Sequence, residues 1–382
     1  MAKILISLTY YLPNISGITI YAQILSRELA RNHQLTILTS KFKSSLPKRE
    51  TTDKIKILRI WAPIKINKGI IMPTFPLVSL IEVLKSDLVI CHLPQLEAIW
   101  LVLWAKLLRK PIILVHHCEF GDAPGMINQI IKLITYLPHH LSYRWATKII
   151  AYTQDYAQHS IFLSKFLDKT EFILPPVTIG RKNQRKIKEV AKKIGKTKTT
   201  KIIGFVGRIG WEKGIDVLLK TIPLLKKEFD KFKVVLVGPY QEVIGDKTYQ
   251  KLKPLLKRYQ DWVILTGAVP HQELINYYLN FDCLVLPSTN SLETFGIVQA
   301  EAMISGCPVV ASNLPGVRVP IKLTKMGKIA PVGKPRALTK AIIQVVKNKN
   351  KLSKRGIIAQ KIFSRTKFLF KWKKVVQEVL SG

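Results

Sequence analysis

Short apolar runs rich in β-branched residues alternate with longer stretches of helical spacing through the first half of this chain. The apolar runs are "KILISL", "QLTILTS", "DLVICHLP" and "PIILVHHCEF". Between the first two lies "YAQILSRELARN", in which Tyr21, Leu25 and Leu29 share one helical face. Strands separated by helices of this length form right-handed βαβ units and hence a parallel sheet. The alternation therefore predicts an α/β fold with doubly wound parallel sheets.

The alternation stops at Pro175-Pro176 and then begins again. Residues 181–201 hold ten basic residues and one acidic residue, a composition typical of a solvated connector. Five further apolar runs follow: "KIIGFVGRIG", "FKVVLVGPY", "WVILTGAV", "DCLVLPS" and "CPVVAS". We expect two Rossmann-like domains, residues 1–176 and 177–362, and a C-terminal helix within residues 363–382. Such a pair of open sheets binds ligands at the carboxyl ends of the strands, which predicts a cleft between the domains.

The chain carries 61 basic and only 24 acidic residues, a formal net charge of +37. A bias towards lysine would not explain the shortage of Asp and Glu, so we expect an anionic partner. Phosphate esters, an anionic lipid surface and nucleic acid all fit this charge. With 47% apolar residues the chain can bury sizeable cores, which excludes a disordered tail.

The four cysteines stand far apart without a C-x-x-C pair, so neither a disulfide framework nor a zinc site is indicated. The opening "MAKILISLTYYLP" is interpreted as a first strand, because no long apolar region or cleavage site follows it. The most apolar run, residues 98–105, is far below the roughly 18 residues that a membrane span needs. We therefore predict a cytoplasmic protein without a transmembrane helix.

Charged residues of the second half stand at predicted strand ends. Arg208 comes just past one strand, and Lys213 begins the next helix. Two cations there can neutralise a diphosphate without a metal. The unpaired amides of a helix start around Gly296, Ile297 and Val298 would stabilise the same anion.

Two glutamates flank that helix start. In "SLETFGIVQAEAM" the residues Glu293 and Glu301 are eight positions apart. A carboxylate near phosphate is unfavourable unless it binds hydroxyls, and one carboxylate can accept from two vicinal hydroxyls. We expect Glu293 to hold a transferred sugar and Glu301 the ribose of a nucleotide.

The same two carboxylates could serve as the acid and base of a glycosidase. Retaining pairs are about 5 Å apart and inverting pairs up to about 9.5 Å. In a continuous helix, eight residues span about 12 Å. A loop at Glu293 would shorten this distance, so the spacing disfavours hydrolysis but leaves it open.

"SLETFGIVQAEAM" followed by "SGCPVVASNLPGVRVPI" resembles the E-x7-E signature of retaining glycosyltransferases of the family-four type, which have the GT-B fold. "GRIGWEKGID" is similar to the phosphate-binding stretch of that family. The resemblance extends to "SGITIYAQILSREL", "PIILVHHCEF" and "TKMGKIAPVGKPRALTKAI", and so covers nearly the whole chain. It implies that the C-terminal helix packs back towards the first domain.

The resemblance also implies roles for single residues. The strand-terminal histidine of the family falls on His117, which is expected to contact the sugar and stabilise its developing positive charge. The glycine-rich first loop falls on Ser16-Gly17, where one glycine is kept. Backbone near Val269 would meet the nucleobase. The implied donor-binding and catalytic set is Gly17, His117, Arg208, Lys213, Val269, Glu293, Phe295, Gly296, Ile297, Val298 and Glu301.

What the resemblance implies is a retaining, metal-independent glycosyltransferase that needs no cofactor. The donor would be a UDP- or GDP-sugar, and the acceptor a lipid-linked or polysaccharide hydroxyl in cell-envelope synthesis. Two alternatives remain. One is a sugar-nucleotide epimerase or phosphorylase of the same shape, and the other is a module that binds nucleic acid or an anionic surface. Aromatic residues are not interleaved with most basic runs, so nucleic acid is not the expected partner.

Residues 124–148 combine apolar residues at helical spacing with Lys132, His139, His140 and Arg144. This segment fits an element at a membrane interface, and it fits equally a helix pair packed on its own sheet. Basic residues each add about 1 kcal/mol of attraction at an anionic leaflet. The total charge favours peripheral attachment to the cytoplasmic membrane face.

Overall fold

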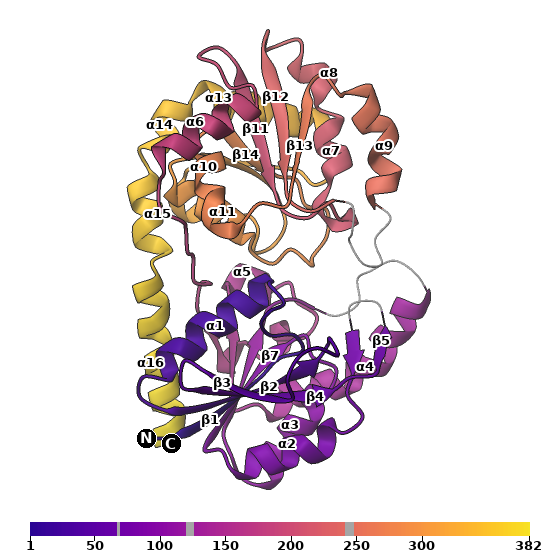
Figure 1. Cartoon of the computed structure of the whole chain (residues 1–382), viewed down its shortest axis with the longest axis vertical. Coiled ribbons are helices and arrows are strands. Elements are labelled where there is room, and N and C mark those ends of the chain that lie inside the picture. Colours follow the sequence, from indigo (N-terminus) through magenta and orange to yellow (C-terminus); the bar gives the residue numbers. More distant parts are fainter. Residues whose placement is uncertain (67–68, 120–125, 241–247) are drawn as a thin grey trace. The chain divides into compact units, whose positions relative to one another are not determined.

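The computed structural model describes residues 1–66, 69–119, 126–240 and 248–382. They form two compact units: Met1–Pro176 with Thr366–Gly382, and Val177–Arg365. Each unit is built on a mainly parallel sheet with helices packed around it (Figure 1). The predicted α/β class with parallel sheets is confirmed.

The first unit contains an eight-stranded sheet in the order β10-β9-β8-β7-β1-β2-β4-β3. Neighbouring strands are parallel except for β3, which pairs antiparallel with β4 at one edge. A separate antiparallel pair joins β5 to β6. The strands are β1 (Lys3–Ser7), β2 (Gln34–Lys41), β3 (Arg49–Thr52), β4 (Ile55–Trp61), β5 (Ile64–Ile66), β6 (Gly69–Ile71), β7 (Leu88–Leu93), β8 (Ile112–His116), β9 (Lys148–Ala151) and β10 (Thr170–Phe172).

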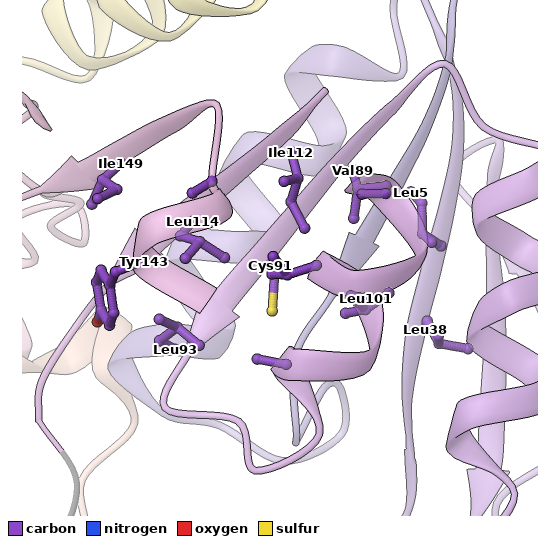
Figure 2. Packing of buried hydrophobic residues seen from close by; sticks show 14 of the residues in the cluster. Leu5, Leu38, Val89, Cys91, Leu93, Leu101, Ile112, Leu114, Tyr143 and Ile149 are labelled. Carbon is purple, nitrogen blue, oxygen red and sulfur yellow. The ribbon is translucent and has the colours of Figure 1, made fainter. Parts of the chain in front are cut away.

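The central strands of this sheet are buried on both faces. All six residues of β7 are buried, which explains the unbroken apolar run "LVICHL". Figure 2 shows side chains of strands and helices gathered in this core, among them Leu5, Leu38, Cys91, Leu101, Leu114 and Tyr143. The helices of the unit are α1 (Gly17–Leu29), α2 (Phe75–Leu84), α3 (Ala98–Leu107), α4 (Met126–Trp145), α5 (Gln154–Ala157), η1 (Leu163–Lys165), η2 (Leu167–Lys169) and α16 (Arg365–Ser381).

The second unit contains a six-stranded, fully parallel sheet in the order β13-β12-β11-β14-β15-β16. The strands are β11 (Lys201–Val206), β12 (Phe232–Val237), β13 (Val263–Gly267), β14 (Cys283–Leu286), β15 (Val309–Ser312) and β16 (Gly327–Ala330). The helices are α6 (Gln184–Lys193), η3 (Trp211–Lys213), α7 (Ile215–Leu219), α8 (Ile222–Leu225), α9 (Thr248–Arg258), η4 (His271–Glu273), α10 (Leu274–Tyr278), α11 (Ile297–Ile304), α12 (Val319–Thr324), α13 (Pro335–Lys347), α14 (Lys349–Ser353) and α15 (Gly356–Ile362).

The C-terminal helix α16 packs on α1 in the first unit (Figure 1). Trp372 Nε1 donates a 2.8 Å hydrogen bond to the hydroxyl of Tyr21. The ring of Phe368 meets the ring of Tyr21 edge to face, with centroids 5.0 Å apart. Lys373 forms a 2.9 Å ion pair with the buried carboxylate of Glu28. One apolar stripe and one ion pair therefore attach the last helix to the first.

Trp372→Ala removes a fully buried indole together with its hydrogen bond to Tyr21. We expect the free energy of unfolding of the first unit to fall by about 3–5 kcal/mol, because large cavities in a packed core relax poorly. Urea unfolding followed by tryptophan fluorescence and circular dichroism measures the change. Phe370→Ala is the matched control, since Phe370 lies on the same helix and is 70% exposed. Equal effects of the two variants would contradict the packing of α16.

Asp282 of the second unit is 6% exposed and lies at the centre of a cluster of charged side chains. Its carboxylate pairs with Lys196 and, at 2.8 Å, with Lys349, and it accepts a 2.7 Å hydrogen bond from the amide of Ile202. Burial raises the pKa of Asp282, but the hydrogen bonds from Lys196 and Lys349 outweigh burial and leave the pKa below its ordinary value of 3.8. Burial lowers the pKa of Lys196, yet that lysine is protonated in acid, so Asp282 governs the acid response.

Because the pKa of Asp282 is lower in the folded chain than in the unfolded one, this carboxylate stabilises the fold above pH 3.8. The contribution is lost as the pH falls through the lowered folded value. Asp282→Asn should cost about 3 kcal/mol of unfolding free energy at pH 7, since it leaves two lysines without their partner. Urea unfolding at pH 7 and across the acid range tests this. Asp216→Asn, in the more exposed pair with Lys220, should change stability by less than about 1 kcal/mol.

Candidate active site

The order of the second sheet reverses between β11 and β14. Ligands of open parallel sheets bind at the carboxyl ends of the strands at such a point. Arg208 follows the end of β11 by two residues, and the loop after β14 carries Glu293. Arg208 and Glu293 therefore lie on the two loops that flank the reversal point.

A close backbone approach joins these two loops. Gly214, directly after η3, has φ 63°, and a Cβ there would lie 2.1 Å from the carbonyl oxygen of Pro287. The amide of Thr289 donates to the carbonyl oxygen of Glu212 at 2.9 Å. Only glycine fits at position 214, because a side chain would collide with backbone and the φ is left-handed. The turn that carries Lys213 is thereby held against the segment after β14.

Lys213 and Glu293 form an ion pair between the loops, with Nζ and Oε2 2.6 Å apart. Their side chains are 20% and 13% exposed, so water screens the pair only in part. Arg208 pairs with Glu212, whose side chain is 3% exposed. Each predicted cation therefore has a carboxylate partner. Glu212 was not predicted from the sequence, although its spacing of four residues from Arg208 is common among ion pairs.

Helix α11 begins directly after Gly296, which has φ 73°. A Cβ at this position would lie 2.4 Å from Cδ2 of Leu286, so the turn requires glycine. Ile297 and Val298 are the first residues of the helix, where amides lack an acceptor within the helix. The side chain of Phe295 packs in the core and is 1% exposed. A ligand contact at Phe295 would therefore come from its backbone.

Glu301 lies inside α11 and is 3% exposed. Its Oε1 is 2.8 Å from Nε2 of His271, and its Oε2 accepts a 2.7 Å hydrogen bond from the hydroxyl of Tyr278. The hydrogen bond with Glu301 raises the pKa of His271 against the opposing effect of burial. Within the described ranges Glu301 shares no hydrogen bond or ion pair with Lys213 or Glu293. The two predicted glutamates thus belong to separate clusters.

Val269 lies in the segment between β13 and η4. β13 ends at Gly267, whose φ of 76° turns the chain, and η4 begins at His271. The predicted nucleobase contact and the imidazole that holds Glu301 are therefore two residues apart. His271 and Tyr278 were not predicted from the sequence, in which the closeness of His271 to Val269 is the one signal for either.

Gly17 is the first residue of α1 in the first unit, and it is exposed. The preceding Ser16 caps the helix, since its hydroxyl accepts a 3.2 Å hydrogen bond from the amide of Thr19. Gly17 lies outside the left-handed region, so the local backbone does not require glycine. Its place at a helix start fits the expectation of an anion near this loop.

His117 follows β8 and is 4% exposed. Its Nε2 is 2.8 Å from Nδ1 of His92, and its Nδ1 is hydrogen-bonded to the hydroxyl of Tyr152. Burial lowers the pKa of His117 well below its usual value, and His92 and His116 add to the effect. The imidazole is therefore neutral near pH 7, and both ring nitrogens already have protein partners.

Neither His92 nor Tyr152 was predicted from the sequence as a partner of His117. His92 lies on β7 and Tyr152 follows β9, the two strands on either side of β8. Such neighbours follow from the strand order, which the apolar pattern does not specify. His116 has a different hydrogen-bond partner, since its Nδ1 is 2.5 Å from the hydroxyl oxygen of Tyr143.

Within the residues that the structure covers, no group of three or more His, Cys, Asp or Glu side chains could hold a metal ion. None of the helices described above is both long and apolar enough to cross a membrane.

Two family models match most of the chain. Residues 15–178 match the model for Glycosyltransferase Family 4, and residues 186–362 match the model for Glycosyl transferases group 1. An uncharacterised glycosyltransferase of Methanocaldococcus jannaschii is 27% identical over 324 residues, which cover 81% of this chain and 79% of that protein. The alpha-monoglucosyldiacylglycerol synthase of Streptococcus pneumoniae is 34% identical over 134 residues, covering 35% of this chain and 29% of that protein.

The solved structure of Anabaena HepE in complex with UDP aligns over 100% of both chains, with a TM-score of 0.76 and 17% identity. At this identity the likeness shows the fold alone. The matched models and the relatives favour a transferase over an epimerase, a phosphorylase or a binding module. The chain belongs to the group 1 glycosyltransferases and has the GT-B type of fold.

Proposed function

We propose that this glycosyltransferase takes its sugar from a nucleotide-diphosphate sugar bound mainly by the second unit, and transfers it with retention of configuration and without a metal. The observation that carries the proposal is the contact between Lys213 and Glu293 at the reversal point of the sheet. In this contact, a group that can bind phosphate lies beside a group that can bind hydroxyls. A donor in which a diphosphate is joined to a sugar requires both groups side by side.

The diphosphate would lie between Lys213, Arg208 and the first amides of α11. A lysine ammonium has three donors, so Lys213 can keep Glu293 and still donate to phosphate oxygens. Glu293 only accepts hydrogen bonds, so it would bind hydroxyls of the sugar. Cations and a helix start in this position stabilise the charge that develops on a departing diphosphate.

In the proposed reaction, the bond between the anomeric carbon and the phosphate oxygen breaks, and the nucleoside diphosphate leaves with the bonding electrons. The acceptor hydroxyl oxygen forms its new bond to the same face of that carbon. Its proton passes to an oxygen of the departing diphosphate. The sugar contact expected of His117 stays a prediction, since its ring nitrogens are hydrogen-bonded to His92 and Tyr152 within the first unit.

We propose a lipid-linked or polysaccharide hydroxyl as the acceptor. The name of the Streptococcus pneumoniae relative, alpha-monoglucosyldiacylglycerol synthase, supports a glycolipid product. The exposed apolar surface of the first unit supports it independently.

The segment expected as a membrane element or a helix pair is one helix, α4, with Pro138 inside it. The C-terminal half packs on the unit through buried residues such as His139 and Tyr143. The N-terminal half carries a stripe of apolar side chains that are 49% to 78% exposed: Met126, Ile130, Leu133, Ile134 and Leu137. Residues 124–125 and the side chain of Lys132 lie outside the described residues.

This stripe has the character of a membrane-contacting surface. Helix α4 contains no acidic residue, and Lys165 donates to the hydroxyl of Tyr136 on the same helix at 3.1 Å. Apolar residues Leu77, Ile81 and Leu84 of α2 are also at least half exposed. Apolar contact together with a net charge of +37 supports peripheral attachment to an anionic membrane.

Lys213→Ala and Glu293→Gln should each lower kcat/KM by about 100-fold or more, because each removes a group that would contact the reacting donor. Release of nucleoside diphosphate from UDP- and GDP-sugars measures the rate, after a thermal-shift screen has identified the donor that stabilises the chain. Lys220→Ala, which removes a lysine from the exposed pair with Asp216, should leave the rate unchanged. An unchanged rate in the Lys213 and Glu293 variants would refute the site.

Leu133→Ser combined with Leu137→Ser should lower binding to vesicles by about tenfold or more, because two exposed leucines lose their apolar contact. Sedimentation with phosphatidylcholine vesicles, with and without phosphatidylglycerol, measures the bound fraction. Ile357→Ser is the control, since Ile357 is 65% exposed but lies on α15 of the second unit. Equal binding of the unaltered chain, the double variant and the control to the vesicles would contradict attachment through α4.

A further inference from the structure

Two protein donors from α10 and its preceding turn fix the carboxylate of Glu301. The hydroxyl of Tyr278 donates to Oε2 at 2.7 Å, and Nε2 of His271 lies 2.8 Å from Oε1. Tyr278 is 1% exposed and Glu301 3%, so both are held in the interior. The side chain of His271 is 34% exposed, so this end of the cluster reaches the surface.

The two bonds leave part of the carboxylate unused. An ionised carboxylate accepts only, and each oxygen can take about two hydrogen bonds. Among the residues that the structure describes, each oxygen has one protein donor, which leaves one acceptor direction on each oxygen and fixes the plane of the group. A carboxylate buried to this degree would be unfavourable without these donors. The arrangement therefore offers two oriented acceptor positions rather than a mobile charge.

A pair of adjacent hydroxyls on one ring matches two such positions. The cluster stands next to Val269, where the nucleobase is expected, and on the helix whose first amides would meet the diphosphate. The ribose of a nucleotide links the base to the phosphates. A carboxylate that lies between the expected base position and the expected diphosphate position would therefore meet the two ribose hydroxyls.

We infer that His271 and Tyr278 are positioning residues that orient Glu301 towards the 2′- and 3′-hydroxyls of the donor ribose, and that they set the preference for ribonucleotides. The inference rests on the proposed function of the second unit. The competing interpretation is that both residues only attach α10 to α11. A purely structural attachment would affect every nucleotide alike, whether or not it carries ribose hydroxyls.

The test measures the affinity of UDP and of 2′,3′-dideoxy-UDP for the full chain by titration calorimetry, with GDP and its dideoxy form in parallel. The unaltered chain should bind the ribonucleotide at least roughly tenfold more tightly. Tyr278→Phe and His271→Gln should each weaken ribonucleotide binding by roughly 3- to 10-fold, the effect of one hydrogen bond. Binding of the dideoxy form should change by less than about twofold.

Tyr277→Phe is the matched control, since it removes the same hydroxyl from the neighbouring position of α10 and should leave both affinities unchanged. Thermal unfolding verifies that each variant is folded, and His271→Gln decides the question if Tyr278→Phe does not fold. The inference is overturned if the variants bind both nucleotide forms equally more weakly, or if the unaltered chain does not prefer the ribonucleotide. If sugar transfer is intact in that case, the proposed function still stands. Absence of any binding of UDP or GDP overturns the proposed function as well.

Discussion

The parallel pairing of β11 with β14 is the constraint on which the site of the second unit depends. The register places Gly204 opposite Leu284, and a Cβ at Gly204 would lie 2.1 Å from the ring of Phe281. A glycine at this point therefore lets a large aromatic ring pack against the sheet where the strand order reverses. Because both strands run in the same direction, their two following loops emerge side by side. The ion pair of Lys213 with Glu293 follows from that geometry.

The few acidic residues of this basic chain include several at buried, hydrogen-bonded positions. Glu212, Glu301 and Asp282 are between 2% and 6% exposed, and each holds at least one basic partner. Glu119 in the first unit is also buried and accepts from Ser160 and from the amide of Ile161. Acids in such positions orient lysine, arginine and histidine side chains. Even with these acids counted, the net charge of +37 leaves a positive field that can attract anions.

The sequence was sufficient for the fold, because apolar periodicity and turn residues report local structure directly. It also predicted Arg208, Lys213 and Glu293 at one edge of the sheet, where the structure shows Lys213 in contact with Glu293. It failed for Glu212, His271, Tyr278, His92 and Tyr152, which act through contacts between side chains. The choice of such partners depends on strand order and helix packing, and neither leaves a periodic signal. The burial of Phe295 was missed for the same reason.

The first unit combines residues from both ends of the chain, and Tyr21 and Trp372 are separated by 351 positions. Proteins are synthesised from the N-terminus, and domains commonly fold as soon as their residues are available. Here the sheet of the first unit can form early, but the face of α1 around Tyr21 and Glu28 stays uncovered until α16 has been synthesised. The whole second unit leaves the ribosome in the meantime. The first unit is thus completed only after the second unit has been synthesised, so a chain truncated before α16 keeps an uncovered apolar face.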